Sequence, residues 1–361
     1  MLKDEDTVED RDQYRPRLAL TMGDVAGIGP EVVAQAVTDP WVRTQTRPIV
    51  VGHPDLLRRA LRLIGRDAEV RPLENLSTIP GEVAEILCWN PAGDEVLDVP
   101  PGGIDGRAGR AAYHYLVSAA RAALARQIDG IVTAPLNKAA LKLGGYDYPG
   151  HTEILAEECG VREFGMMLYL PPGEVVRSPH GLGVVHVTLH TSIRSVPDLL
   201  TTGGVREKIE LIESFSREMG APRPRVAVCA LNPHAGEGGM FGDEEARLIE
   251  PAVQAARGAG LDVTGPLPAD TLLKRAVSGE FDAVVAMYHD QGHIALKLIA
   301  FESAVNVTLG LPIIRTSPSH GTAFDIAWQG RAQAHGMIQA LRVAALRARQ
   351  AFASHPGSES V

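Results

Sequence analysis

Residues 225–252 read RVAVCALNPHAGEGGMFGDEEARLIEPA, which is an apolar run, a glycine-rich loop and a helical pattern in succession. The apolar run at 225–231 shows no clean alternation, as is typical of a strand covered on both faces. Four glycines at 236–242 free the loop backbone to approach a ligand closely. A helix is expected to begin near Asp243, so this stretch predicts one strand–loop–helix unit of an α/β fold.

The same succession recurs along the chain. Other apolar runs lie at 18–22, 48–52, 85–89, 130–135, 184–189, 283–288 and 305–310, and helical patterns lie at 107–127, 204–219, 243–258 and 331–352. We therefore expect two α/β/α domains with a cleft between them. The first domain is expected at 17–136 plus 300–352 and the second at 137–299, with a disordered acidic arm at 1–16 and a tail at 353–361.

Composition and charge exclude several classes of protein. Of the 361 residues, 45% are hydrophobic and 22% charged, and 35 Lys and Arg against 44 Asp and Glu give a net charge of −9. A chain with net negative charge lacks the positive electrostatic potential that non-specific binding of nucleic acid requires. It also has no apolar run long enough to cross a bilayer. The chain has three cysteines, Cys88, Cys159 and Cys229, which are widely spaced. An odd number of widely spaced cysteines argues against a disulfide framework. We expect a cytoplasmic protein without disulfides that binds neither nucleic acid nor membrane.

Three of the 12 histidines follow buried strands. His190 ends VVHVTLH, His234 follows RVAVCALNP, and His289 ends AVVAMYH. A single histidine at the end of a strand is more often a structural residue. The strand ends of a parallel sheet, however, meet at one edge, so the three side chains can converge there. Three imidazoles are a usual ligand set of a catalytic metal ion. His186 is interpreted as a buried core histidine. The others discussed are interpreted as surface or helix residues: His53, His114, His335 and His355.

A second polar group predicts an anion pocket. Lys297, Asn306 and Arg315 are flanked by apolar, strand-like residues, so each is expected to bury its stem and direct a donor to one place. Lysine and arginine donors suit a phosphate or a carboxylate. His151 and Thr152, in GHTEIL (150–155), lie at an expected helix start, which also favours an anion. The alternative is a structural ion-pair network with Asp270, Asp290 or Glu302.

The glycines of LALTMGDVAGIGPE (18–31) lie between an expected strand and an expected helix. Their spacing is not G-x-G-x-x-G, and no acidic residue is evident about 20 positions later on a second strand. A dinucleotide site of the Rossmann type is therefore not expected at this loop.

Several motifs occur in the order and spacing of one family. They are MGDVAGIGPE (22–31), TAPLNK (133–138), GHTE (150–153), LNPHAGEGG (231–239), GPLPADT (265–271), YHDQGH (288–293), NVTLGLPIIRTS (306–317) and HGTAFDIA (320–327). Over residues 17–350 the chain resembles the 4-hydroxythreonine-4-phosphate dehydrogenase (PdxA) family. The resemblance implies domains like those of isocitrate and isopropylmalate dehydrogenases, and an obligate homodimer with active sites at the subunit interface.

The resemblance also implies residue roles. The ligands of a divalent metal, drawn from both subunits, are His190, His234 and His289. Zinc is the expected ion, with magnesium, manganese and cobalt as alternatives. The substrate contacts are His151, Thr152, Lys297, Asn306 and Arg315. His320 and Asp325 are candidate contacts to NAD or NADP, and Lys297, Asp270 and Asp290 are candidates for the catalytic base.

The implied reaction is the metal-assisted oxidation of a 4-phosphorylated 3-hydroxy acid, followed by decarboxylation of the 3-oxo product. Candidate substrates are 4-phosphohydroxy-L-threonine, which belongs to pyridoxine biosynthesis, and D-threonate or D-erythronate 4-phosphate. QGHIALKL (291–298) resembles the branch that acts on the last two, and also terephthalate cis-dihydrodiol dehydrogenases, which are an alternative. A phosphate acyltransferase or a non-catalytic phosphate- or metal-binding protein are further alternatives. The departures from the family pattern are Val25, Pro318–Ser319 and Trp328–Gln329.

Overall fold

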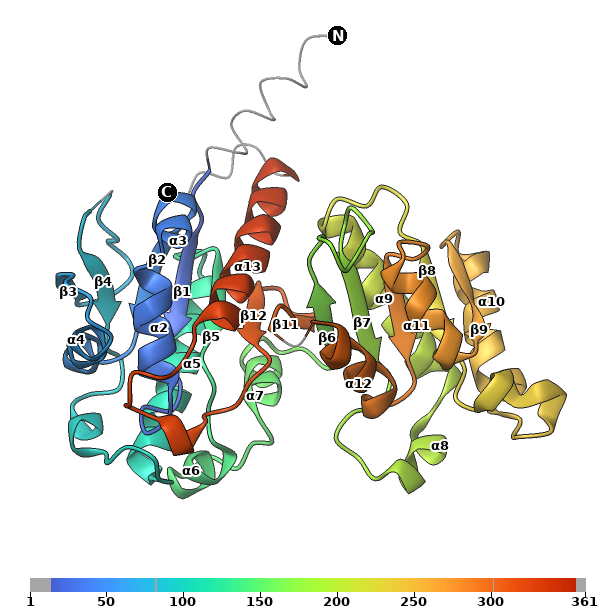
Figure 1. The fold of residues 1–361 in the computed structure, drawn as a ribbon, viewed down its shortest axis with the longest axis horizontal. Helices are drawn as coiled ribbons and strands as arrows, with labels where there is room; N and C mark the ends of the chain where they lie inside the picture. Colours follow the sequence, from blue (N-terminus) through green and yellow to red (C-terminus); the bar gives the residue numbers. More distant parts are fainter. Residues whose placement is uncertain (1–13, 82, 301, 355–361) are drawn as a thin grey trace, which may run out of the picture. The chain divides into compact units, whose positions relative to one another are not determined.

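The computed structural model describes residues 14–81, 83–300 and 302–354 of the chain (Figure 1). Most of the acidic arm expected at 1–16, and most of the tail expected at 353–361, lie outside these described residues. Within the described ranges, no helix is long and apolar enough to cross a membrane.

Two compact units make up the chain. Unit 1 comprises Met1–Arg162 and Leu311–Val361, and unit 2 comprises Glu163–Gly310. The boundaries differ from those expected at 136 and 300. Residues 137–162 group with unit 1 because the helices α6 (Lys138–Leu143) and α7 (His151–Glu158) pack against α5 (Gly106–Leu124). Residues 300–310 group with unit 2 because β11 (Val305–Leu309) pairs with β6 (Gly165–Leu170).

Unit 1 contains parallel strands in the spatial order β3-β4-β2-β1-β5-β12. Their bounds are Val70–Leu73, Ile86–Trp89, Arg47–Val51, Arg17–Thr21, Gly130–Thr133 and Arg315–Pro318 in that order. β5 is buried along its whole length and β1 over its last four residues, as their non-alternating apolar sequences predict. All these strands run the same way, so their carboxyl ends lie at one edge of the sheet.

Helices cover both faces of this sheet. α2 (Gly29–Val37) and α13 (His335–Ser354) lie on one face, and α5 lies on the other (Figure 1). α3 (Pro40–Gln45) and α4 (Pro54–Leu63) flank β2 in sequence. A side chain at Gly109 of α5 would meet the carbonyl oxygen of Ala140 at 2.0 Å, so glycine permits the close approach of α5 and α6.

Unit 2 contains strands in the spatial order β11-β6-β7-β10-β8-β9. β7 (Leu182–His186), β10 (Ala283–Ala286), β8 (Val226–Cys229) and β9 (Val263–Leu267) are parallel. β6 is antiparallel to both of its neighbours. The largely parallel sheet expected from the sequence is therefore confirmed, with an antiparallel portion around β6 in this unit.

The helices of unit 2 also lie on both faces of their sheet. α9 (Thr202–Glu218) and α10 (Glu250–Gly258) lie on one face, and α11 (Ala269–Val277) and α12 (His289–Ala300) on the other (Figure 1). α8 (Val196–Leu199) follows β7. The core between the sheet, α11 and α12 is apolar and includes Leu168, Val184, Ala227, Leu272, Val284 and Leu296. Both units are thus α/β, as expected.

Candidate active site

The three histidines predicted to bind metal all follow strands of unit 2 that are neighbours in the sheet. His190 lies four residues after β7, His289 begins α12 three residues after β10, and His234 lies five residues after β8. β10 lies between β7 and β8 and is parallel to both. The three segments that carry these histidines therefore leave the sheet at one edge, as predicted.

His190 and His289 lie close together. Their ring centroids are 5.9 Å apart. Nδ1 of His289 is 2.7 Å from Oδ1 of Asp290. When Nδ1 carries the proton it donates to this carboxylate, and Nε2 then keeps a lone pair for a cation. Asp290, one of the candidates for the catalytic base, is thus placed to orient the His289 ring.

His234 lies in a strained turn at Pro233–Gly239. His234, Ala235 and Glu237 have φ angles of 53°, 55° and 45°, in the left-handed region that non-glycine residues seldom adopt. The start of this turn is held by Glu245, whose Oε1 accepts the N–H groups of Leu231 at 2.8 Å and Asn232 at 2.7 Å. Such strain persists where the surroundings impose it, and it is concentrated at functional sites.

The three predicted metal ligands are not all brought together within one chain. His190 and His289 can supply two of the nitrogen ligands that zinc and similar ions take from histidine. His234 instead lies beside Phe241, with ring centroids 6.5 Å apart. In the part of the chain that the structure describes, no three His, Cys, Asp or Glu side chains are grouped so that they could hold a metal ion. We call His190 and His289 the two-histidine half site.

A buried histidine pair adjoins the half site. Nδ1 of His293 is 3.1 Å from Nε2 of His186, and the His293 ring stacks on His289 with centroids 3.9 Å apart. Burial, and then the nearby His293, lower the pKa of His186 to about 3. Burial, His289 and Lys297 lower the pKa of His293 to about 4. Both rings are therefore neutral near pH 7. The interpretation of His186 as a buried residue is confirmed.

Two predicted anion contacts meet in unit 1, at the carboxyl end of β5. Arg315 is only 4% exposed, and its Nη2 donates to Oγ1 of Thr133 at 2.8 Å. Nε2 of His151 donates to the carbonyl oxygen of Ala134, the next residue, at 3.2 Å. Burial, and then the charge of Arg315, hold the pKa of His151 well below its usual value. Burial lowers the pKa of Arg315 to about 10, opposed by Glu153.

The remaining predicted contacts have the following places. Thr152 is the second residue of α7 in unit 1, and Lys297 of α12 and Asn306 of β11 belong to unit 2. Among the described residues, Lys297 has no ion-pair partner, so the alternative of a network with Asp270, Asp290 or Glu302 is not seen for this lysine. Asp270 is exposed in the first turn of α11.

The cofactor loop is expected at 320–327, after β12 in unit 1. In the structure the irregular segment continues to Gly330, and we call residues 320–330 the cofactor loop. His320 precedes Ala323, which has a φ of 43°, and Asp325 lies in the short turn Phe324–Ile326. Nε2 of His320 is buried and has no hydrogen-bond partner among the described residues. Two departures from the family pattern contact each other here, since Nε1 of Trp328 donates to the carbonyl oxygen of Val25 at 2.8 Å.

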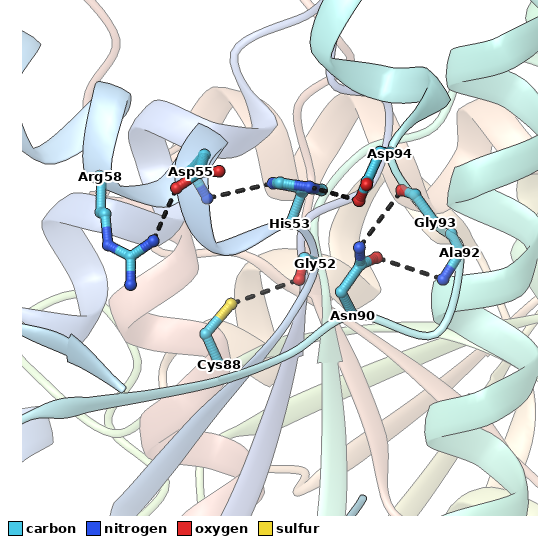
Figure 2. Close-up of polar contacts among 9 residues, drawn as sticks. All are labelled: Gly52, His53, Asp55, Arg58, Cys88, Asn90, Ala92, Gly93 and Asp94. Carbon is cyan, nitrogen blue, oxygen red and sulfur yellow. Dashed lines mark hydrogen bonds and ion pairs between the residues drawn. The ribbon is translucent and has the colours of Figure 1, made fainter. Parts of the chain in front are cut away.

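His53 corrects the sequence interpretation. It was expected at the surface or on a helix, but it is only 5% exposed and lies just after β2. Figure 2 shows its ring between Asp55 and Asp94. Its Nδ1 accepts the N–H of Asp55 at 3.1 Å and so caps α4, which leaves Nε2–H to donate to Asp94 at 3.1 Å. His53 is therefore a buried cap that also holds the loop around Asp94.

Three further residues support the site and were not singled out from the sequence. Thr133 holds Arg315. Gln291 accepts the N–H of Met287 and donates to the carbonyl oxygen of Ala230, both at 2.7 Å, which joins the ends of β10 and β8. Glu31 accepts backbone N–H groups of the cofactor loop. The sequence did contain a signal for their importance, because these residues lie in the motifs TAPLNK, YHDQGH and MGDVAGIGPE.

Comparisons with known proteins show the family of the chain. Residues 44–344 match the family model described as pyridoxal phosphate biosynthetic protein PdxA. The chain is 44% identical over 335 residues to a 4-hydroxythreonine-4-phosphate dehydrogenase of Geobacter metallireducens, covering 93% of this chain and 96% of that protein. It is 42% identical over 330 residues to a D-threonate 4-phosphate dehydrogenase of Salmonella typhimurium, covering 91% and 97%.

A solved structure gives the same result. The crystal structure of a 4-hydroxythreonine-4-phosphate dehydrogenase from Klebsiella pneumoniae matches with a TM-score of 0.82 and 42% identity, covering 92% of this chain and 99% of that one. Identity at this level over nearly the whole length of each chain shows that the chain belongs to the PdxA family and is a dehydrogenase.

Proposed function

We propose that this dehydrogenase oxidises the secondary alcohol of a 4-phosphorylated 3-hydroxy acid. The observation that carries the proposal is the buried guanidinium of Arg315 beside His151 at the end of β5. A buried arginine is a strong donor to phosphate because its planar fork matches two phosphate oxygens. The substrates named for the relatives, 4-hydroxythreonine 4-phosphate and D-threonate 4-phosphate, both carry such a phosphate.

The other anion contacts are assigned to the same substrate. Lys297 supplies a point charge, and Asn306 and Thr152 supply hydrogen bonds. Binding energy from the phosphate, which does not react, would be used to orient the reacting carbon. His151 stays neutral beside Arg315, and its Nε2–H is already bonded to Ala134. Its Nδ1 would therefore accept a hydrogen bond from a hydroxyl group of the substrate.

A nicotinamide cofactor is implied by the dehydrogenase family. We propose that His320 and Asp325 contact it and that a divalent cation, with zinc as the first candidate, binds at His190 and His289. When bound, the nicotinamide supplies the hydride acceptor and the cation a Lewis acid for the hydroxyl group. Asp290 holds the His289 ring, and Lys297, Asp270 and Asp290 remain the candidates for accepting the hydroxyl proton. The 3-oxo acid then loses CO₂, because its ketone accepts the electron pair of the breaking bond.

We also propose a homodimer in which His234 completes the half site of the partner subunit. Support comes from exposed apolar side chains on the unit 2 segments that carry the predicted ligands. Ile193 and Leu199 follow His190, Met240 and Phe241 follow His234, and Ile294 and Leu298 follow His289. Exposed apolar side chains on segments that leave one edge of the sheet favour an interface there.

The test follows cofactor reduction by absorbance. Purified protein, NAD or NADP and a divalent metal would be mixed with 4-phosphohydroxy-L-threonine, D-threonate 4-phosphate, D-erythronate 4-phosphate and a terephthalate cis-dihydrodiol in turn. We expect turnover of a phosphorylated substrate that a chelator abolishes and added metal restores. Turnover of the dihydrodiol alone would replace our proposal with the alternative substrate class. Metal-independent turnover would contradict the proposed metal site.

A further inference from the structure

Glu31 is a buried carboxylate in unit 1 whose role the reaction above does not explain. It is 0% exposed, and among the described residues no cationic side chain pairs with it. Its oxygens instead accept two backbone N–H groups of the cofactor loop, Oε2 from Trp328 at 2.5 Å and Oε1 from Gly330 at 2.8 Å. Glu31 lies in the first turn of α2, where the helix N-terminus stabilises an anion.

The loop needs such support because its backbone is strained. Trp328 has a φ of 57° and Ala323 a φ of 43°, both in the left-handed region. A non-glycine residue stays in this region when its surroundings impose it. Glu31 binds the strained residue itself, through the backbone N–H of Trp328. The carboxylate therefore acts directly on the conformation of the loop.

Other groups of α2 and the turn before it contact this loop and the residues just after it. The N–H of Ile28 donates to the carbonyl oxygen of Thr322 at 3.0 Å. Gln35, one helical turn after Glu31, donates to the carbonyl oxygen of Ala332 at 2.7 Å and accepts from the N–H of Ala334 at 3.2 Å. Glu31 provides the charged contact of this set, and hydrogen bonds to a charged group are the stronger ones.

We propose that Glu31 is a positioning residue for nucleotide binding: its carboxylate fixes loop 320–330 in the shape that presents His320 and Asp325 to the cofactor. This inference rests on the proposed function, in which that loop contacts the nicotinamide nucleotide. A second observation points to a ligand here, since Nε2 of His320 is buried without a hydrogen-bond partner among the described residues. A hydroxyl, phosphate or ring nitrogen of a nucleotide can supply that partner.

The charge and the second acceptor oxygen of Glu31 can be removed with little change of shape. In Glu31→Gln the amide nitrogen cannot accept, so one loop N–H would face an N–H donor. We expect the Kd for the cofactor to rise about tenfold or more. Amide hydrogen exchange at Trp328 and Gly330 should become faster in the free protein. Binding of inorganic phosphate, as a probe of the Arg315 pocket, should not change.

The experiment compares full-length wild type, Glu31→Gln and a matched control by calorimetric titration with NAD and NADP and by hydrogen exchange. The control is Glu213→Gln, because Glu213 is a buried glutamate of unit 2 that pairs with Arg217. We expect it to keep the wild-type Kd. If Glu31→Gln fails to fold, Glu31→Asp keeps the charge but is too short to reach both N–H groups, and it should show the same two effects in smaller measure.

The outcomes separate this inference from the proposed function. Unchanged cofactor Kd and unchanged exchange in a folded Glu31 variant would overturn the positioning role while leaving the dehydrogenase proposal in place. Wild-type protein that binds neither NAD nor NADP would overturn the cofactor role of the loop, and with it both proposals. Faster exchange together with an unchanged Kd would show a purely structural contact and would also overturn the inference.

Discussion

Arg315 and Thr133 join β12 to the carboxyl end of β5, through a hydrogen bond of 2.8 Å from Nη2 to Oγ1. The guanidinium is buried, so its orientation is set by this contact and by its packing rather than by solvent. The next residue of the chain after Thr133, Ala134, accepts from His151. One strand end therefore positions two of the residues that we assign to substrate binding.

Arg315→Lys should weaken binding of the phosphorylated substrate. Lysine keeps the charge but loses the planar fork, so we expect kcat/KM to fall about 10- to 100-fold, mainly through KM. Thr133→Val, which removes only the hydroxyl contact, should raise KM several-fold. Arg275→Lys serves as a control, because Arg275 forms a surface ion pair with Glu280 in unit 2. Steady-state kinetics measure the effect, and an unchanged KM for Arg315→Lys would refute the assigned pocket.

Subunit complementation should reveal a shared active site. His234→Ala and Lys297→Ala homodimers should each be inactive, since each lacks a needed group in both sites. In a mixture that exchanges subunits, the mixed dimers have one intact site, so about a quarter of wild-type activity should return. Metal content by mass spectrometry should be lost in His234→Ala. If the mixture stays inactive although mixed dimers are detected, His234 does not act in the site of the partner subunit.

Gly27→Ala should disturb the cofactor loop. An added Cβ would lie 2.7 Å from the carbonyl oxygen of Thr322 and 2.9 Å from its Cβ, and this backbone cannot yield without moving the loop. We expect the free energy of unfolding to fall by roughly 1–3 kcal/mol. This loss should be seen as a lower melting temperature, and cofactor binding should be weaker. Gly103→Ala is the matched control, because nothing lies within 4 Å of its added Cβ. Equal cofactor affinity in both variants would contradict the close contact at Gly27.

Metal-free protein should lose stability as the pH falls below about 6.5. Burial and His293 lower the pKa of His186 to about 3 in the folded state, whereas the unfolded chain takes up the proton near 6.5. Below that pH the unfolded state binds more protons, so the free energy of unfolding should drop by about 2 kcal/mol between pH 7 and pH 5 from this group. Urea unfolding of chelator-treated wild type and His186→Gln measures it. The same pH slope in both proteins would exclude His186 as the cause.

Part of the candidate site could be predicted from local sequence. Strand-end positions of His190, His234 and His289 follow from apolar runs that end just before them, and parallel strands bring their carboxyl ends to one edge. Local sequence does not show how far apart the loops lie once they have left this edge of the sheet. His190 and His289 come together, whereas His234 lies on a separate strained turn.

Long-range backbone contacts explain most of what could not be predicted. His53 was expected at the surface or on a helix, but it is buried, and it contacts the loop around Asp94, 41 residues away. Glu31 contacts Trp328 across 297 residues. A side chain that binds backbone N–H groups leaves no pattern in the sequence of its partner, because every residue except proline carries the same donor.

The α/β class, the succession of strands and helices, and the residue types available for an anion and a metal can all be predicted from local sequence. These depend on hydrophobic periodicity and turn chemistry, which act over a few neighbouring residues. The division into two units, the meeting of His190 with His289, and the contacts that hold Arg315 and the cofactor loop are set by the folded chain. Those outcomes depend on packing and hydrogen bonds between segments far apart in the chain, whose geometry exists only once the sheets have formed.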